Sequence, residues 1–418
     1  MNEETSVAAG IVPEGERCPH FGECGGCTEQ HVAYAEQLSQ KALRLEGLFK
    51  SYWSGAVGIT PSPSVWHYRN KLDLNFGRKH YPEPPPKDFP RETVLGFKRG
   101  GKWFWTLDIE ECRIGPEGTD ALLASVRGWA RDRNLTAFSS KTKDGYLRIL
   151  LIREGKRTGE RMAVLITNEG ELDRQGFIEA VQSSFHCDSI QWAVFRGKAE
   201  IAAADEIVVL DGKATIEEAL EVPDGASTRR LRFRISPFSF FQTNTFATER
   251  LYGIIRGWVR ESRPRILYDL YGGSGGIALT CADLVDRVVS VESEESASID
   301  GTHNSETNRV DDVMFITQKV EDYLRDTLSA QGALQPRSMV VVDPPRAGLH
   351  PKALKRLVAL HPPEIIYVSC KPQVLVGELP SFLAAYDLVD LHGVDLFPHT
   401  EHVEVLARLK RKEEAAAP

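Results

Sequence analysis

The sequence of 418 residues predicts an α/β protein built from two dissimilar parts. From about residue 236 onward, short apolar strands alternate with helical stretches, which is the pattern of a doubly wound, mainly parallel sheet. From about 64 to 235 the signals are mostly strands separated by turn residues, with one helix near 172–185. This second pattern indicates an antiparallel α+β domain. A segment rich in cysteine and glycine precedes both.

Each expected strand is a run of β-branched, aromatic and aliphatic residues that ends at turn-forming residues. Those of the α+β domain cover 67–77, 93–109, 146–152, 161–167, 189–197 and 206–212. Those of the doubly wound part cover 265–271, 287–292, 312–317, 338–345, 364–370, 386–397 and 403–409.

Residues 30–53 have the spacing of an amphipathic helix, with Leu38, Leu43, Leu45 and Leu48 among the apolar positions. We expect this helical segment to pack on the doubly wound domain. The predicted division of the chain is 1–29 cysteine segment, 30–63 helical segment, 64–235 central domain, 236–411 doubly wound domain and 412–418 disordered tail.

The composition is that of a soluble globular protein, with 42% hydrophobic and 26% charged residues. No apolar run is long enough to span a bilayer, and the polar, acidic start MNEETS does not resemble a signal peptide. We therefore expect a cytoplasmic protein with no membrane partner. Thiols stay reduced in that compartment, so the seven cysteines do not predict a disulfide framework.

The charge is unevenly distributed. The net charge is −8, but residues 64–161 carry 20 Lys/Arg against 13 Asp/Glu, which is +7 and leaves −15 elsewhere. A second basic cluster comprises Arg229, Arg230, Arg232 and Arg234, of which the last three share one face of a strand. Such patches are either solvated surface or sites for phosphate groups of a nucleic acid.

YDLYGGSGGIAL (268–279) is a strand that ends in an acid, followed by a glycine-rich turn and the start of a helix. The turn allows close backbone approach to a ligand, and the next strand ends in Glu292, placed for ribose hydroxyls. These features predict a nucleoside cofactor, which is either NAD or S-adenosylmethionine. Asp343-Pro344-Pro345 at the end of a later strand favours S-adenosylmethionine, because dehydrogenases have no use for a rigid acidic turn there.

Cys18, Cys24 and Cys27 have C-x5-C-x2-C spacing, which indicates metal ligation in a reduced compartment. Cys112 is the candidate fourth ligand, because Cys187 and Cys281 lie in unremarkable settings. Ligation by thiolates alone suits zinc or a [4Fe–4S] cluster, and the spacing leaves that choice open.

Cys370 lies in YVSCKP (367–372), at the point where Pro372 ends a strand. A lone cysteine in that position is more often a packing residue than a nucleophile. Its role therefore depends on the rest of the chain.

Six stretches, taken in order, resemble the RNA uracil-5-methyltransferase family, whose members make 5-methyluridine with S-adenosylmethionine. They are FFQTN (240–244), DLYGGSGG (269–276), VVSVE (288–292), VVDPPRAG (341–348), YVSCKP (367–372) and FPHTEHVE (397–404). The resemblance implies a Rossmann-like methyltransferase sheet for the doubly wound part, here called the catalytic domain, and an RNA-binding role for the central domain.

The resemblance also implies roles for single residues. Cys370 is expected to add to C6 of uracil as the nucleophile, and Glu404 to remove the C5 proton as the base. Five residues are expected to line the cofactor and uracil pockets: Gln242, Tyr271, Gly276, Glu292 and Asp343. Phe241 is expected either to pack beside the target base or to belong to the core. The uridine must be flipped out or single-stranded to reach the thiol.

The related ribosomal-RNA enzymes of this family carry a [4Fe–4S] cluster in a similar motif. The resemblance therefore implies such a cluster on Cys18, Cys24, Cys27 and Cys112, and 23S ribosomal RNA as the partner. We expect a monomer without an obligate protein partner. Only 17 residues precede Cys18, so no N-terminal β-barrel is expected. We therefore expect residues 64–161 and 229–234 to make the RNA contacts.

The sequence departs from the family pattern at two further places. Tyr271-Gly272 stands where relatives have Phe-Cys, and Lys371 stands where they commonly have Asn. A cation beside Cys370 should favour the thiolate.

Three alternative functions stay open. They are methylation of transfer RNA by the same chemistry, a catalytically weak iron–sulfur protein that binds RNA, and a nicotinamide enzyme with a catalytic thiol.

Overall fold

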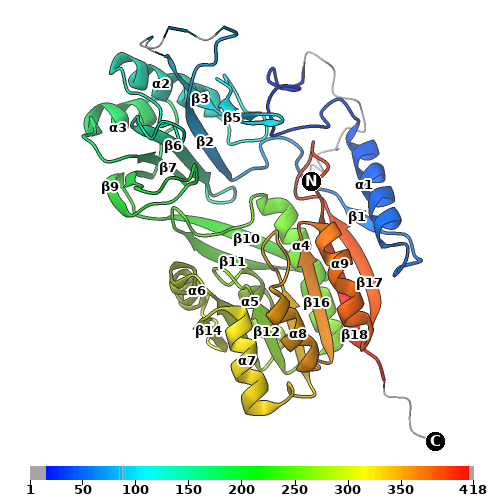
Figure 1. The fold of residues 1–418 in the computed structure, drawn as a ribbon. Helices are drawn as coiled ribbons and strands as arrows, with labels where there is room; N and C mark the ends of the chain where they lie inside the picture. Colours follow the sequence, from blue (N-terminus) through cyan, green and yellow to red (C-terminus); the bar gives the residue numbers. More distant parts are fainter. Residues whose placement is uncertain (1–15, 84, 87–88, 90, 414–418) are drawn as a thin grey trace, which may run out of the picture.

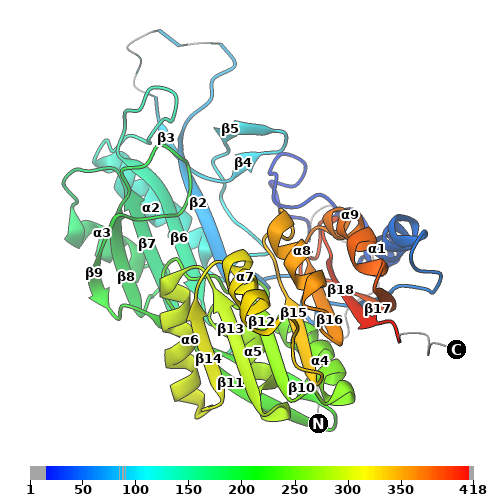
Figure 2. The same ribbon diagram turned by 60° about the horizontal axis from the view of Figure 1, so that its bottom comes forward.

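The computed structural model describes residues 16–83, 85–86, 89 and 91–413, which form two large sheets with their helices (Figures 1 and 2). The predicted disordered tail lies mainly outside the described residues, as does most of the segment before Cys18. Within the described ranges, no helix combines the length and the apolar character needed to cross a membrane.

The catalytic domain is built on an eight-stranded sheet with the order β1-β17-β18-β16-β15-β12-β13-β14. The strands from β16 to β14 are parallel, whereas β18 runs antiparallel to both of its neighbours. The bounds are β1 Gly58–Thr60, β12 Ile266–Leu270, β13 Arg287–Glu292, β14 Val313–Thr317, β15 Ser338–Val342, β16 Glu364–Ser369, β17 Tyr386–Val394 and β18 Glu404–Arg411.

Both faces of this sheet are covered, which explains why its central strands are continuous apolar runs. One face packs on α4, α5, α6 and the β10–β11 hairpin, and the other on α1, α7, α8 and α9. The helices are α4 Thr245–Ser262, α5 Gly276–Cys281, α6 Glu295–Asn308, α7 Val320–Gln331, α8 Pro351–Ala359 and α9 Pro372–Leu383. The predicted doubly wound sheet is thus present.

The central part holds a six-stranded sheet with the order β3-β2-β6-β7-β8-β9. It is antiparallel as predicted, except that β7 and β8 are parallel and joined through α3 (Arg174–Gln182). Helix α2 (Thr119–Asp132), which the sequence did not predict, packs with α3 on one face. The strands are β2 Lys71–Arg78, β3 Thr93–Gly96, β6 Leu147–Glu154, β7 Arg161–Thr167, β8 Ser189–Val194 and β9 Glu206–Gly212.

The two sheets share one hydrophobic core. The second face of the central sheet, with Ile149 and Val164, packs in the same cluster as Leu220 of β10 (Ile216–Asp224) and Leu251 of α4. Strand β11 (Ser227–Ile235) pairs with β10 and contacts α6. The hairpin therefore joins the two parts of the chain. The predicted boundary at 235 and the other domain limits stay predictions.

The helical segment forms α1 (Tyr34–Phe49), which packs against α9 and β1. Its buried face follows helical spacing but differs from the predicted one: it comprises Tyr34, Gln37, Lys41, Leu45 and Phe49. Leu43, predicted as apolar and inward, is 66% exposed. Two long polar side chains occupy the buried stripe because they have partners inside the fold, as described below.

Candidate active site

The carboxyl ends of neighbouring strands bring the predicted catalytic residues together. Cys370 directly follows β16, and Ser369 pairs with Val405 of the antiparallel β18. One step further along this register places Cys370 opposite Glu404, the first residue of β18. Asp343 follows the adjacent β15. A thiol and two carboxyl groups thus converge on one edge of the sheet.

Burial raises the pKa values of the carboxyl groups in this cluster. Desolvation raises the pKa of Asp343 to about 7, and the hydrogen bond that Gln242 donates to it (3.4 Å) opposes the rise. Glu404 is 2% exposed, and burial together with the charge of Asp343 raises its pKa well above its usual range. Asp269 of β12 has a pKa of about 7 for the same two reasons. The cluster therefore holds protons more tightly than free carboxylates do.

The same surroundings act on the thiol. Burial, followed by the charges of Glu404 and Asp343, raises the pKa of Cys370 to about 11, while Arg346 lowers it. The thiol also precedes the N-terminus of α9, where the helix dipole favours an anion. Lys371 was predicted to favour the thiolate, but the main cationic contribution comes from Arg346. The side chain of Lys371 is exposed, which explains its weaker effect.

The glycine-rich turn lies beside this cluster. Tyr271 and Gly273 have positive φ values of 65° and 54°, a conformation that Tyr271 adopts although it carries a side chain. The Gly273 N–H donates to Glu292 (3.1 Å), so the predicted ribose-binding acid contacts the turn. A side chain at Gly276 would collide with the Tyr252 hydroxyl. This position therefore requires glycine.

A narrow cleft of ≈30 Å³ lies between the glycine-rich turn and FFQTN. Four of the five residues predicted to line the pocket do so, namely Gln242, Tyr271, Gly276 and Asp343. Next to it, Asp269 Oδ1 and Ser290 Oγ are buried without a hydrogen-bond partner in the described chain. Unpaired buried acceptors are costly and mark a place where a ligand can donate hydrogen bonds. The residues present therefore fit a bound nucleoside cofactor.

The aromatic residues of FFQTN divide between core and cleft. Phe241 is 8% exposed and packs against Phe233, with ring centroids 5.6 Å apart. Phe240 is 62% exposed at the cleft. The core alternative for Phe241 thus has structural support, and Phe240 is the aromatic side chain available to a base.

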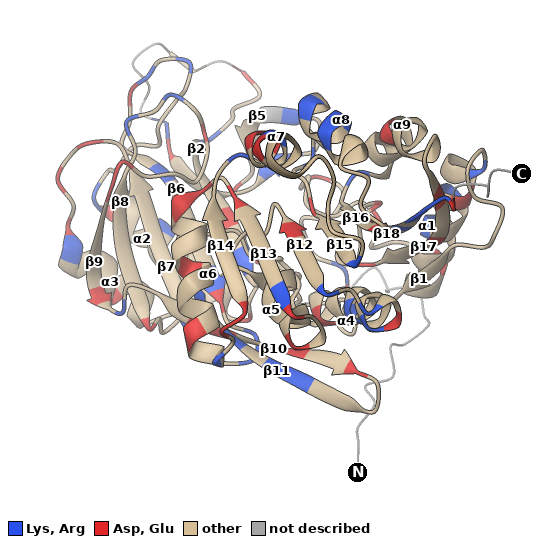
Figure 3. Ribbon diagram, turned by 90° about the horizontal axis from the view of Figure 1, so that it is seen from below, with Lys and Arg blue, Asp and Glu red and all other residues tan. Residues whose placement is uncertain are grey.

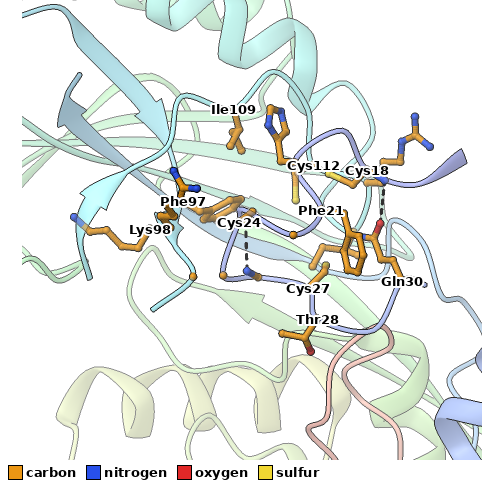
Figure 4. Close-up of a pocket in the computed structure, with 18 of the residues that line it drawn as sticks. Cys18, Phe21, Cys24, Cys27, Thr28, Gln30, Phe97, Lys98, Ile109 and Cys112 are labelled. Carbon is orange, nitrogen blue, oxygen red and sulfur yellow. Dashed lines mark hydrogen bonds between the residues drawn. The ribbon is translucent and has the colours of Figure 1, made fainter. Parts of the chain in front are cut away.

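The four predicted metal ligands line one cavity of ≈960 Å³, shown in Figure 4. Cys18, Cys24 and Cys27 come from the N-terminal segment, and Cys112 comes from the loop that precedes α2. The Cys18 N–H donates to Gln30 (2.9 Å), and the Gly26 N–H donates to the Cys24 sulfur (3.4 Å). The fold therefore brings together cysteines that are far apart in sequence.

The cysteines influence one another without forming a compact single-ion site. Burial and neighbouring thiols raise the pKa of Cys27 to about 11 and that of Cys112 to about 12. Among the described residues, no group of three or more His, Cys, Asp or Glu side chains is arranged to hold a metal ion. Four thiols that line one cavity are nevertheless the donor type that the prediction requires.

The arginines of the second basic cluster have acidic partners within the fold. All four of its arginines form ion pairs, and Figure 3 shows basic residues on β11 and acidic residues on α6. The partners are Asp283 for Arg229, Glu221 for Arg230, Glu217 for Arg232 and Asp300 for Arg234. Arg229 and Arg234 thus join the hairpin to the catalytic domain, whereas Arg230 and Arg232 pair with β10 inside the hairpin.

Comparison with known proteins places this site in a family. The model of the tRNA (uracil-5-)-methyltransferase family matches residues 199–412, just over half of the chain. An uncharacterized RNA methyltransferase of Caldanaerobacter subterraneus is 32% identical over 94% of this chain and 84% of its own length. The tRNA (uracil(54)-C(5))-methyltransferase of Pyrococcus furiosus is 32% identical over 95% of this chain and 85% of its own.

A solved structure of a related enzyme supports the same family assignment. The tRNA (uracil-54, C5)-methyltransferase of Pyrococcus abyssi, in complex with S-adenosyl-L-homocysteine, superposes with a TM-score of 0.70. It is 30% identical and covers 94% of this chain and 86% of its own. This chain belongs to the RNA uracil-5-methyltransferase family. The resemblance inferred from the six motifs is thereby confirmed.

Several site residues of this family member escaped sequence reasoning. Arg346 follows the Asp-Pro-Pro turn and lowers the pKa of Cys370. The sequence could have indicated it, because it is a cation close to Asp343 at the end of a strand. Tyr252 of α4 is buried against Asp343, Asp269 and Glu404, which together with burial raise its pKa well above the usual range. Only the fold brings Tyr252 to this cluster, so no local pattern could have identified it.

Proposed function

We propose that this protein methylates C5 of a uridine in RNA with S-adenosylmethionine as the methyl donor. The observation that carries the proposal is the placement of Cys370 opposite Glu404 on adjacent strands, beside a cleft lined by the glycine-rich turn. Family membership supports the same reaction.

The residues divide the reaction between them. The Cys370 thiolate forms a bond to C6 of uracil, and the electron pair displaced from the C5–C6 double bond makes C5 nucleophilic. S-adenosylmethionine, when bound, supplies an electrophilic methyl group to C5. Glu404 then takes the C5 proton, the double bond forms again, and the sulfur leaves C6 with its electron pair.

The carboxyl cluster fits the last of these steps. A base works best when its pKa lies near the working pH, and burial raises the pKa of Glu404 toward that range. Asp343, held by Gln242, lies between the cleft and Glu404 and is placed to contact the uracil ring or the cofactor.

Transfer RNA is the first candidate substrate. Relatives that align with 95% and 94% of this chain are named for uracil 54 of transfer RNA. The sequence predicted 23S ribosomal RNA instead, and the four cysteines are the observation that keeps it as a second candidate. Both RNAs contain uridines in loops, where a base can be flipped toward the thiol.

We further propose that Cys18, Cys24, Cys27 and Cys112 hold a [4Fe–4S] cluster. The sulfurs around a single tetrahedral zinc ion lie about 3.8 Å apart, given bonds of about 2.3 Å. The four cysteines line a cavity of ≈960 Å³, which leaves room for an inorganic core larger than one ion. The four cysteines would be its ligands, with a structural role.

The reaction is tested with labelled S-adenosylmethionine and unmodified transcripts of transfer RNA and of 23S ribosomal RNA. We expect label in 5-methyluridine, and its loss with Cys370→Ala. Cys187→Ala, a buried thiol of the central domain, is the matched control and should retain activity. Binding of NAD in place of S-adenosylmethionine, or activity that survives Cys370→Ala, would contradict the proposal.

The cluster is tested separately by metal analysis of anaerobically purified protein. We expect iron with broad absorbance near ~400 nm, the range of thiolate-bound iron–sulfur centres, and its loss in Cys112→Ala but not in Cys187→Ala. Stoichiometric zinc without this absorbance would refute the cluster and leave the methylation proposal intact.

A further inference from the structure

The connection that delivers Glu404 to the active site is fixed by buried polar contacts along most of its length. It covers residues 395–403 between β17 and β18. The Leu396 carbonyl accepts a hydrogen bond from Asn244 (3.1 Å), and the Pro398 carbonyl accepts one from the Tyr68 hydroxyl (3.2 Å). Loops are usually solvated and mobile, so this degree of internal fixation requires an explanation.

His399 is the centre of these contacts. It is 1% exposed and has a φ of 65°, in the left-handed region that a residue with a side chain rarely adopts. Its carbonyl accepts from the N–H groups of Thr28 (2.9 Å) and Glu29 (3.0 Å), which directly follow Cys27. Its ring lies 4.1 Å from that of Trp66, centroid to centroid. The segment carrying three of the cysteines is thereby joined to the connection that ends at Glu404.

Gln37 of α1 fixes His399 from the other side. Its side-chain oxygen accepts from the His399 N–H (2.9 Å), so its amide nitrogen faces the His399 ring. That nitrogen donates to the carbonyls of Val32 (2.9 Å) and Glu29 (3.0 Å), and it lies 3.3 Å from Nδ1 of the ring. Gln37 is fully buried, so each of its bonds excludes water.

A buried ion pair completes the arrangement. Lys41, one turn further along α1, donates to Asp395 (2.8 Å) and to the Phe397 carbonyl (3.3 Å). Both charged side chains are fully buried. Helix α1 thus contacts the connection at Asp395, Phe397 and His399, before the chain enters β18.

We propose that Gln37 is a positioning residue for methyl transfer: together with His399, Thr28 and Glu29 it forms a clamp that sets the position of Glu404. The inference rests on the proposed function, because it assigns the clamp to one step of that reaction. Lys41 and Asp395 fix the start of the same connection.

The clamp has a specific kinetic consequence. Bond formation between Cys370 and C6 does not need Glu404, whereas removal of the C5 proton does. A loosened clamp therefore slows only the release of the product. The methylated base should then stay bound through its C6–sulfur bond, because that bond breaks only when the C5 proton leaves.

The test is the Gln37→Met variant, which keeps the length of the side chain and removes its polar atoms. The full-length protein is incubated with S-adenosylmethionine and the RNA that the wild type methylates, and covalent protein–RNA complex is measured on denaturing gels. We expect turnover to fall at least tenfold while the covalent fraction rises, as in Glu404→Gln. Gln40→Met on the same helix is the matched control, because the Gln40 amide donates to Glu36 on the solvent side.

His399→Asn is the second variant, because Asn tolerates a left-handed backbone and preserves the main-chain bonds to Thr28 and Glu29. It should accumulate the same complex. If both variants lose turnover without accumulating the complex, or keep full turnover, the clamp is refuted. An inactive wild type would instead contradict the proposed function, so the two failures are distinguishable.

Discussion

Replacement of Lys41 by methionine is the most direct test of how helix α1 is held to the catalytic domain. The variant removes the ammonium group that bonds Asp395 (2.8 Å) and the Phe397 carbonyl (3.3 Å). Asp395 is fully buried, so its carboxylate would remain without a counter-charge. Its other hydrogen bond, from the Phe397 N–H (3.1 Å), is too weak to compensate for a charge.

The expected loss follows from this burial. Removing one partner of a buried ion pair destabilises a protein by about 3–5 kcal/mol, because the remaining charge stays desolvated. With a denaturant dependence of about 3 kcal/mol/M, this loss lowers the urea midpoint by roughly 1–2 M. Equilibrium unfolding in urea, followed by far-UV circular dichroism, measures the shift.

The matched control is Lys50→Met at the exposed end of the same helix, which should change the free energy of unfolding by less than about 0.5 kcal/mol. Adding Asp395→Leu to Lys41→Met should restore most of the lost stability, because no charge is then buried alone. A loss below about 1 kcal/mol for Lys41→Met would refute the reasoning and place Lys41 in contact with water.

Three further predictions concern the reaction. Because the pKa of Cys370 is raised and the thiol acts as the thiolate in the free enzyme, kcat/KM should rise with pH between 6 and 9; a flat profile would contradict this. Arg346→Gln removes a cation that lowers the thiol pKa, so activity should fall about tenfold, more at pH 6.5 than at pH 9. Gly276→Ala should weaken S-adenosylmethionine binding at least tenfold in calorimetry, because the new methyl group collides with Tyr252.

The strands of the catalytic domain were predictable because a parallel sheet covered on both faces needs apolar runs of a defined length. Predicted segment 287–292 coincides with β13, and 161–167 coincides with β7 of the central sheet, which is also covered on both faces. The same reasoning located the candidate catalytic residues, since functional groups in such sheets follow the carboxyl ends of strands. Cys370 and Asp343 are both found by this rule.

Other features depend on contacts that no local pattern encodes. Leu43 was assigned to the buried face of α1, yet Gln37 and Lys41 are inside because His399 and Asp395 offer them partners. The arginines of β11 look like a phosphate site in sequence, and only the fold shows that Arg230 and Arg232 have acidic partners on β10 and Arg234 has one on α6. Polar residues are misassigned when their partners lie far along the chain.

The repulsion between the negative charges of Cys370 and Glu404 opposes formation of the thiolate, because the charge of Glu404 raises the pKa of the thiol. The effect is mutual, since a thiolate at the same distance makes ionisation of Glu404 equally unfavourable. While the thiolate is free, the pair therefore favours a protonated Glu404, which leaves the thiolate without a competing charge. Once sulfur is bonded to C6 it is neutral, so its share of the penalty on Glu404 is removed, while burial and the charge of Asp343 still raise the pKa of Glu404. Loss of the Glu404 proton to water is therefore easier after the C6–sulfur bond has formed than before, which is the order that the chemistry needs.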